Sequence, residues 1–511
     1  MSAASRQVIS TWAGNRACAP ARDRARRRLL AASLGSGLVY SGYAVVAFLP
    51  RHVAVPTYYL FDALGHRLLA ALGYVLALAL LFAAAMLVWW TTRQADAGDR
   101  WLRRWAIAPP VVFALLLTCT QPLTSRDLFH YLMEGRVLGR YGANPYLFPP
   151  STFPHDVFFR YTNWADYTSP YGPIWNLLGA ALTRIAGDNL IWSVLLFKLV
   201  ALAGYLACGV LIWAVLRALG RPPLPGTAFW LWNPLVLLEF PGAGHNDVLM
   251  LAVLLGGLWL YLTGRYQTAF VALAVAGLVK AVAFAVLPLA LWHYLAPLPD
   301  WNARCRAAAR LCWRPALLVL ALMGPFWVGL GTLGPVREAD HYYASPAHIA
   351  RLLLQRITST LIAGRIVHTT VIVVLAAAYL LLLRRVAGPP ARLVAVALRV
   401  MLVLLVLWTF FVPWYCAWAV ALAAALGDGL LSVPVVVLCA GALASYLFQL
   451  YLPLRMAISV EFRSTLSALL VFVPFGLSLA LVTTTSARRR QRKAGRFPLQ
   501  GEAPTSEPIA G

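Results

Sequence analysis

The chain has 511 residues, of which 61% are hydrophobic and only 12% are charged. Soluble globular domains carry about 25% charged residues, so this composition excludes a water-soluble enzyme. The net charge of +25 would indicate nucleic-acid binding in a soluble chain, but here the basic residues gather at the ends of apolar runs. Such runs, about 17–25 residues long, are typical of helices that cross a bilayer. The sequence therefore predicts an all-α polytopic membrane protein.

Most apolar segments have the length of a single membrane span. They are 29–50, 67–90, 105–121, 190–216, 226–241, 247–263, 315–333, 367–385, 393–412, 414–427, 431–452 and 464–484. The segment 266–293 is too long for one span and must begin and end at basic loops, so we expect two short helices that meet near Lys280. This predicts a bundle of about 12–14 transmembrane helices. Residues 172–187 are apolar but short, and we expect them to form a helix at the outer interface.

Basic residues cluster at alternate ends of these segments, for example at 304–314. The positive-inside rule assigns such clusters to the cytoplasmic face of the plasma membrane. We therefore expect both termini and a 304–314 loop in the cytoplasm. Residues 1–28 and 486–511 are predicted to be basic, disordered cytoplasmic tails on either side of a transmembrane domain over 29–485.

Three polar segments then fall on the outer face, at 122–171, 336–366 and 453–463. The first combines acids, histidines and many aromatic residues, and a loop of that length is usually functional. On a helix, its residues Asp127, His130 and Glu134 would share one face. Such a face suits a general base, half of a metal site or an interfacial polar stripe, and spacing alone does not separate these readings.

Other motifs on the outer side combine aromatic and polar residues. Proline and glycine favour turns around Tyr146 in GANPY and Tyr171 in TSPYGP, and VPWYCAW places Trp414 and Tyr415 in a tight turn. Their aromatic side chains fit a sugar- or lipid-binding cleft or an aromatic belt at the lipid headgroups.

Polar residues also lie at the ends of spans. A helix cap explains one polar residue of GAGHND, but not His245, Asn246 and Asp247 together. Lys280 lies among apolar neighbours, and an ionisable residue within the membrane indicates a functional site. A lipid phosphate is its natural partner. Two arginines of the second outer segment could clamp phosphate by bidentate hydrogen bonds, namely Arg351 and Arg356.

Known nucleotide-binding and metal-binding motifs are absent from the sequence. It contains no P-loop and no HExxH or DxD motif in a plausible context. We therefore expect no cofactor, and a divalent metal is not indicated. A metal-chelated nucleotide sugar is not the expected donor.

The ordered set of motifs resembles a known family. SRDLFHYLMEGR, GANPY, TSPYGPIW, GAGHND, GLVKAVAFAVLPL and VPWYCAW follow one another as in the integral-membrane GT-C glycosyltransferases. The chain is most similar to the polyprenol-phosphate-mannose-dependent α-mannosyltransferases of actinobacterial lipomannan assembly, over residues of about 30–485.

The resemblance implies a GT-C-like bundle with a large first outer loop that carries the catalytic site. It also implies a polyprenyl-phosphate sugar donor, a glycolipid or glycan acceptor, and inversion at the anomeric carbon. The catalytic base falls on Asp127 and the second loop acid on Glu134. The short-helix lysine of the family falls on Lys280, and the helix-start acid falls on Asp247.

This chemistry agrees with the residue types. A polyprenyl phosphate is a good leaving group, whereas an acceptor hydroxyl needs a carboxylate base. Charge that grows on the leaving phosphate is best met by Lys280 or by an arginine, here Arg351 or Arg356. The candidates for substrate contact are His130, Tyr146, Tyr171, His245, Asn246, Asp247, Trp414 and Tyr415. A polytopic lipid or solute transporter is the alternative, which should show charged residues along the midplane and repeat symmetry.

Overall fold

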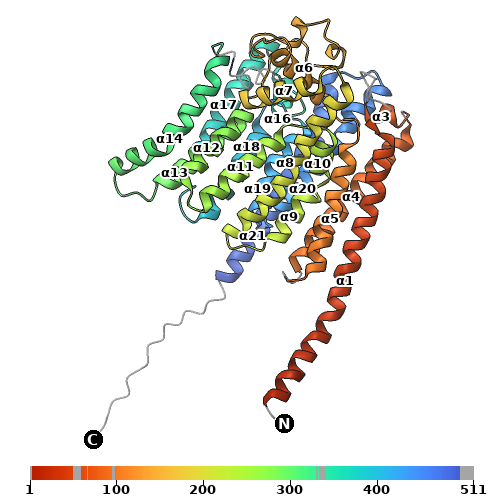
Figure 1. The fold of residues 1–511 in the computed structure, drawn as a ribbon, viewed down its shortest axis with the longest axis vertical. Helices are drawn as coiled ribbons and strands as arrows, with labels where there is room; N and C mark the ends of the chain where they lie inside the picture. Colours follow the sequence, from red (N-terminus) through yellow and green to blue (C-terminus); the bar gives the residue numbers. More distant parts are fainter. Residues whose placement is uncertain are drawn as a thin grey trace.

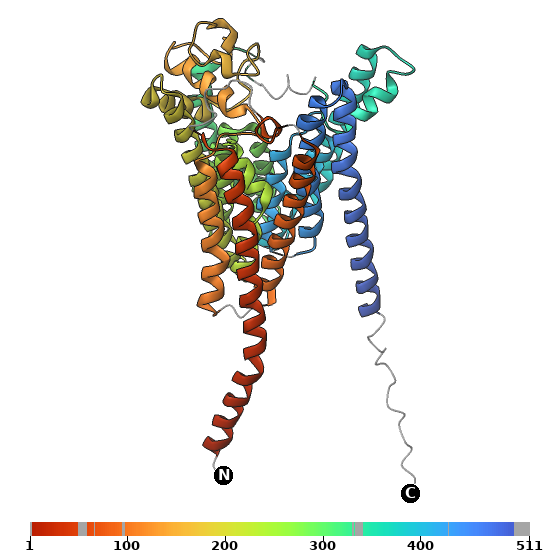
Figure 2. The same ribbon diagram turned by 90° about the vertical axis from the view of Figure 1, so that its right-hand side faces the viewer.

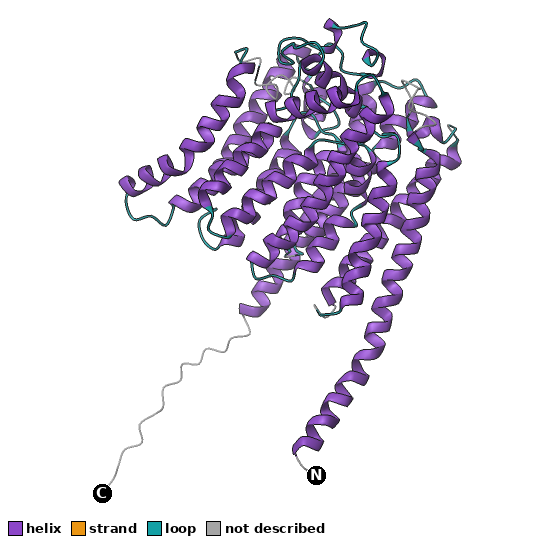
Figure 3. Cartoon of the chain, viewed as in Figure 1, coloured by secondary structure: helices purple, strands orange, loops and turns teal. Residues whose placement is uncertain are grey.

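The computed structural model describes residues 3–49, 59–65, 67–94, 98–329, 332, 341–427 and 429–494. Within these ranges the chain is built from helices and loops, as Figure 3 shows, and its β-structure is confined to two isolated bridges. The prediction of an all-α protein is confirmed.

In the described part of the chain, nine helices are long and apolar enough to cross a bilayer. They are α1 (Ala3–Val46), α4 (Leu68–Gln94), α5 (Arg100–Thr118), α8 (Leu190–Ala218), α14 (Trp301–Met323), α17 (Thr360–Arg384), α18 (Pro390–Leu407), α20 (Ser432–Ala444, with the turns that follow it to Leu454) and α21 (Val460–Ala494). The number rises to ten if the bent pair Pro234–Gly242 and Asp247–Leu262 counts as one span. The prediction of a multi-pass membrane protein is confirmed. The expected 12–14 helices exceed this number because some of the predicted spans form apolar helices that are shorter than the nine long ones.

The region around Lys280 is one such place. α12 (Tyr266–Val279) ends directly before Lys280, whose backbone is extended with φ −150° and ψ 122°. The 3-10 turn η4 (Ala281–Val286) and α13 (Leu287–Leu295) follow. The predicted pair of short helices that meet near Lys280 is therefore confirmed. A short helix at 172–187 is likewise present, as α7 (Pro173–Ala186).

The expectation of a continuous span over 226–241 was wrong. α9 (Pro223–Leu231) ends early, and α10 (Pro234–Leu237) and the π-helical turn η3 (Leu238–Gly242) follow as separate elements. Pro234 cannot donate a backbone hydrogen bond, and its ring clashes with the preceding turn of a helix. The helix therefore restarts at this proline, and a bend of 115° separates the restarted segment from α11 (Asp247–Leu262).

The basic segment 304–314 was expected to be a loop, but it is the first half of α14. Asp300 caps this helix by accepting a hydrogen bond of 2.7 Å from the backbone N–H of Ala303. Alanine, arginine and leucine, which dominate the segment, are strong helix formers. α1 likewise includes residues 3–28, which belong to the 1–28 segment that was expected to be a disordered tail. α21 reaches Ala494, and residues 495–511 lie outside the described ranges.

The long helices run side by side, and the 122–171 segment covers one end of the bundle (Figure 1 and Figure 2). We call this the loop end, because α6 (Asp127–Gly139) and α7 lie there. The first turns of α1 and the last turns of α21 lie at the opposite end. α11 packs between α8 and α12 in the bundle, whereas α14 and α17 bury little of their apolar surface.

Close backbone contact and buried charges fix α6 at the loop end. A Cβ atom at Gly135 of α6 would lie 2.6 Å from the carbonyl oxygen of Gly179 in α7, so only glycine permits this approach. The next residue, Arg136, binds both carboxylate oxygens of Asp156 at 2.9 and 2.8 Å and Asp188 at 2.7 Å. Hydrogen bonds from Arg136 and Arg140 hold the pKa of Asp188 below its usual value. The 122–171 segment is therefore anchored to the helices that flank it.

We expect the loop end and the first half of α14 to lie on opposite sides of the membrane, with the loop end outside. In a variant without its native cysteines, a cysteine at Ser151 should react with an impermeant thiol reagent in intact cells, because the basic residues near Ala308 favour the cytoplasm. A cysteine at Ala308 should react only after permeabilisation. The reverse pattern would contradict the assignment of the loop end to the outer face.

Candidate active site

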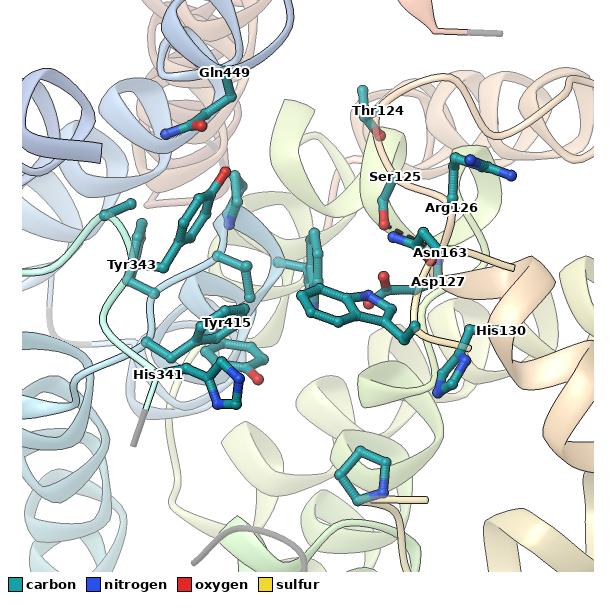
Figure 4. Close-up of a pocket in the computed structure, with 18 of the residues that line it drawn as sticks. Thr124, Ser125, Arg126, Asp127, His130, Asn163, His341, Tyr343, Tyr415 and Gln449 are labelled. Atoms are coloured by element: carbon teal, nitrogen blue, oxygen red, sulfur yellow. Dashed lines mark hydrogen bonds between the residues drawn. The ribbon is translucent and has the colours of Figure 1, made fainter. Parts of the chain in front are cut away.

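A cavity of about 640 Å³ opens at the loop end. Its walls come from segments far apart in the sequence, which face each other in Figure 4. One wall carries Thr124, Ser125, Arg126, Asp127, His130 and Asn163, and the facing wall carries His341, Tyr343, Tyr415 and Gln449. Asp127 and Asp166 are the acidic residues that line it.

Asp127 is the first residue of α6 and presents its carboxylate to the cavity, with 14% of the side chain exposed. Its backbone N–H donates to the hydroxyl oxygen of Ser125 at 3.1 Å, which fixes the start of the helix. The neighbouring Arg126 donates to the carbonyl oxygen of Tyr161 and points away from the centre of the cavity (Figure 4). Asp127 therefore faces the cavity with its charge unmatched by the adjacent arginine.

His130 lies one turn further along α6 and also lines the cavity. Its Nε2 lies 3.1 Å from Oε1 of Glu134, and its Nδ1 lies 3.1 Å from the hydroxyl oxygen of Thr162. Burial lowers the pKa of His130, but the carboxylates of Glu134 and Asp127 outweigh this effect and raise the pKa above its usual value. Glu134 itself is buried behind His130 and does not line the cavity, so it can reach a substrate only through that histidine.

Lys280 lies on the floor of the cavity in an aromatic surround. Its ammonium nitrogen is 2.9 and 3.0 Å from the two carboxylate oxygens of Asp247, which is fully buried. The indole N–H of Trp418 donates to the same carboxylate at 2.7 Å. The rings of Tyr415, Tyr171 and Trp418 lie 4.7, 5.7 and 5.8 Å from the ammonium group. Asp247 therefore binds Lys280 from the buried side, while 14% of the lysine side chain stays exposed.

The TSPYGP turn docks on the helix break that carries Lys280. The backbone N–H of Gly172 donates to the carbonyl oxygen of Val279 at 3.1 Å. A Cβ atom at Gly172 would lie 1.9 Å from the carbonyl oxygen of Leu278, so the contact requires glycine. Tyr146 does not line the cavity, but its hydroxyl donates to the carbonyl oxygen of Tyr171 at 2.6 Å. Tyr146 therefore holds Tyr171 beside Lys280.

A second cavity of about 230 Å³ meets the first at Lys280. The two share Pro170, Tyr171, Lys280, Phe410, Phe411 and Tyr415. The rest of the smaller cavity is lined by apolar and aromatic residues, namely Ala281, Val282, Ala285, Leu404, Leu405, Trp408 and Trp418. Lys280 is thus the charged group at the junction of a polar and an apolar chamber.

The GAGHND motif lies directly behind the cavity wall. The ring of His245 stacks on that of Trp414 with centroids 3.8 Å apart, and Trp414 lines the cavity. Asn246 accepts a long hydrogen bond of 3.5 Å from the hydroxyl of Tyr131. His245 and Asn246, like Asp247, are buried and support the lining residues from behind.

Sequence reasoning missed two buried charged residues near the site. Glu239 is fully buried in η3, with Oε2 3.1 Å from Nε2 of His245. Lys198 is fully buried in α8 and donates to the carbonyl oxygens of Leu117 and Thr120, which precede the segment that leads to Asp127. Both residues interrupt apolar runs in the sequence, and this signal could have identified them.

The structure does not bring every candidate together. Arg351, in α16 (Pro346–Leu354), stacks over the ring of Tyr342 at 4.9 Å, and neither it nor Arg356 lines the cavity. Their side chains would have to leave these positions to meet a donor phosphate. Within the described residues, no group of three or more histidine, cysteine or acidic side chains could hold a metal ion.

The sequence is similar to known mannosyltransferases. Residues 29–296 match a family model described as Alpha-(1->6)-mannopyranosyltransferase, N-terminal domain. Over 205 residues the chain is 32% identical to Alpha-(1->6)-mannopyranosyltransferase A of Corynebacterium glutamicum. The matched segment covers 39% of this chain and 40% of that protein. Over 192 residues it is 33% identical to the protein of that name from Mycobacterium tuberculosis, with coverages of 37% and 36%.

A further relative is Alpha-(1->6)-mannopyranosyltransferase B of Corynebacterium glutamicum, with 32% identity over 188 residues, 32% of this chain and 30% of that protein. The matched segments span less than half the length of each of these relatives. No solved structure matches the chain.

The ion pair between Lys280 and Asp247 predicts the behaviour of a pair of variants. Lys280→Met leaves the buried Asp247 carboxylate without a cation, which should destabilise the protein by about 3–5 kcal/mol. The double variant Lys280→Met/Asp247→Asn removes both charges and should recover most of that stability. Thermal unfolding of the detergent-solubilised variants measures both effects. Equal melting temperatures for the single and the double variant would show that the pair does not stabilise the fold.

Proposed function

Because the chain belongs to the alpha-(1->6)-mannopyranosyltransferase family, we propose that it transfers a mannosyl residue from polyprenyl-phosphate mannose to a glycolipid or glycan acceptor. The observation that carries this proposal is the cavity itself. It exposes a carboxylate, Asp127, and an ammonium group, Lys280, in one chamber at the loop end of a membrane bundle. A reaction between a membrane-borne donor and an acceptor outside the bilayer needs both groups at such a place.

The two chambers fit an amphiphilic donor. An isoprenoid tail is apolar, and the smaller chamber offers it apolar and aromatic walls next to Lys280. An ammonium group has three N–H donors, and the two hydrogen bonds to Asp247 leave one for a phosphate oxygen. The donor phosphate would therefore lie at the junction of the chambers, with the sugar in the larger one.

Asp127 is suited to act as the general base. The oxygen of the acceptor hydroxyl forms a bond to the anomeric carbon of the donor mannose. At the same time, the proton of that hydroxyl passes to the Asp127 carboxylate. The bond between that carbon and the phosphate oxygen breaks, and the electron pair leaves with the phosphate. Lys280 meets the charge that develops there. A single displacement of this kind inverts the anomeric centre and requires no cofactor.

The remaining walls fit a sugar acceptor. Trp164 and Tyr167 of the 122–171 segment line the larger chamber, and so does Trp414. Aromatic faces pack against the apolar faces of sugar rings, and Asn163 and Asp166 add polar groups for hydroxyls. The acceptor is therefore expected to enter from the 122–171 segment.

The proposal is tested by offering the purified protein, in lipid nanodiscs, polyprenyl-phosphate mannose, glucose or arabinose with a mannosylated acceptor. Mass spectrometry should show transfer of mannose only. GDP-mannose without a lipid carrier is the control, because no chelating or phosphate-cradling motif in the sequence suits a nucleotide. Robust transfer from GDP-mannose alone would refute the donor class. The transporter alternative predicts that every lipid is recovered chemically unchanged.

Asp127→Asn should reduce the rate of transfer by at least about 10²-fold, because asparagine keeps the shape of the side chain but cannot accept the proton. Donor binding, measured with radiolabelled polyprenyl-phosphate mannose, should change little. Asp23→Asn, an exposed change of the same kind in α1, is the matched control. Near-normal turnover by Asp127→Asn would transfer the role to Asp166, the other carboxylate that lines the cavity.

A further inference from the structure

His245 lies between two carboxylates. Its Nδ1 is 3.9 Å from Oδ2 of Asp127, and its Nε2 is 3.1 Å from Oε2 of Glu239. His245 and Glu239 are fully buried, whereas Asp127 reaches the cavity. Glu239, His245 and Asp127 therefore follow one another from the interior of the bundle to the cavity.

The burial of Glu239 calls for a cation beside it. An ionised carboxylate without a partner is strongly disfavoured inside a membrane bundle. Tyr446 donates a hydrogen bond of 2.9 Å to Oε1 of Glu239, which leaves Oε2 facing His245. Among the described residues, His245 is the ion-pair partner found within 4.0 Å of Glu239. The imidazole of His245 therefore lies within 4.0 Å of this carboxylate and of the one of Asp127.

The position of the imidazole is fixed on several sides. The backbone N–H of His245 donates to the carbonyl oxygen of Glu239 at 3.2 Å, which ties the residue to the turn η3. Trp414 stacks on the ring with an angle of 17° between the planes. The hydroxyl of Tyr131 lies 3.4 Å from Nδ1. The ring is therefore held with Nε2 beside Glu239 and with Nδ1 on the side of Tyr131 and Asp127.

The other charged groups near these three side chains have partners of their own. Lys280 pairs with Asp247, and His130 pairs with Glu134. Lys198 donates to backbone carbonyl oxygens at the end of α5. His245 is therefore the group able to carry a positive charge that lies on the buried side of Asp127.

We propose that His245 is a positioning residue for the general base: it is the ion-pair partner of Asp127, and Glu239 holds it in that role. This inference rests on the proposed function, since it assigns a duty within the same reaction. His245 does not line the cavity and touches no substrate. It acts by favouring the charged form of Asp127, since an opposite charge within about 4–6 Å stabilises a carboxylate against protonation.

The charge of His245 should be visible in the pH dependence of the reaction. Without the cation, Asp127 is protonated more readily, so the acid limb of the kcat/KM profile should move to higher pH by about one unit. For His245→Gln this means a loss of about tenfold at pH values below the limb and a much smaller loss at pH values above it. His155→Gln changes an exposed histidine of the 122–171 segment that does not line the cavity, and it should leave the profile unchanged.

A uniform loss at every pH value would overturn the proposal, because it would show that the histidine only supports the fold. The double variant His245→Gln/Glu239→Gln removes both buried charges and keeps the size of the side chains near the original, so it covers the case in which the single variant does not accumulate. Its acid limb should also move to higher pH, and coincidence with the wild-type limb would equally overturn the proposal. Wild-type transfer is measured first, so a failure of the proposed function is seen separately as absence of product.

Discussion

The burial of charge in an apolar bundle is the constraint that organises this protein. A charge buried without a partner inside a membrane domain costs several kcal/mol, so each such group must meet one of opposite sign or, like Lys198, backbone carbonyl oxygens. Lys280 meets Asp247, and Glu239 meets His245. All four residues lie where a helix is interrupted or begins. The charge pairs and the helix breaks therefore occur at the same place, namely at Lys280 on the floor of the cavity and in the buried layer behind its wall.

The same interruptions attach the 122–171 segment to the bundle. Gly172 places the TSPYGP turn against the carbonyl groups of Leu278 and Val279, one residue before Lys280. Gly135 brings α6 into backbone contact with α7, which follows that turn directly. The carboxylate of Asp127 and the ammonium group of Lys280 are therefore positioned through one continuous set of close contacts. A shift of the helix break would move both reacting groups together.

Composition and span lengths were sufficient to predict the membrane class, and the excess length of 266–293 was sufficient to predict the break at Lys280. The shared face of Asp127 and His130 followed from helix periodicity. The partner of Lys280 could not be predicted, because Asp247 is 33 residues away and meets it only through the packing of α11 on α12. Glu239 interrupts an apolar run, but the sequence does not show that it pairs with His245, and the direction of Arg351 depends on how α16 packs. Pairing across helices is a tertiary property that single-segment patterns do not contain.

The pairing of Lys280 also bears on how the proposed reaction would be accelerated. A free lysine would bind the singly charged phosphodiester of the donor tightly, and such ground-state binding does not raise kcat. Asp247 already accepts two hydrogen bonds from Lys280 and offsets its charge, so attraction to the bound donor is reduced. As the bond to the sugar breaks, the phosphate gains negative charge, and the remaining N–H donor of Lys280 interacts with it more strongly. A lysine held by a buried carboxylate thus favours the transition state over the substrate, which is the condition for catalysis.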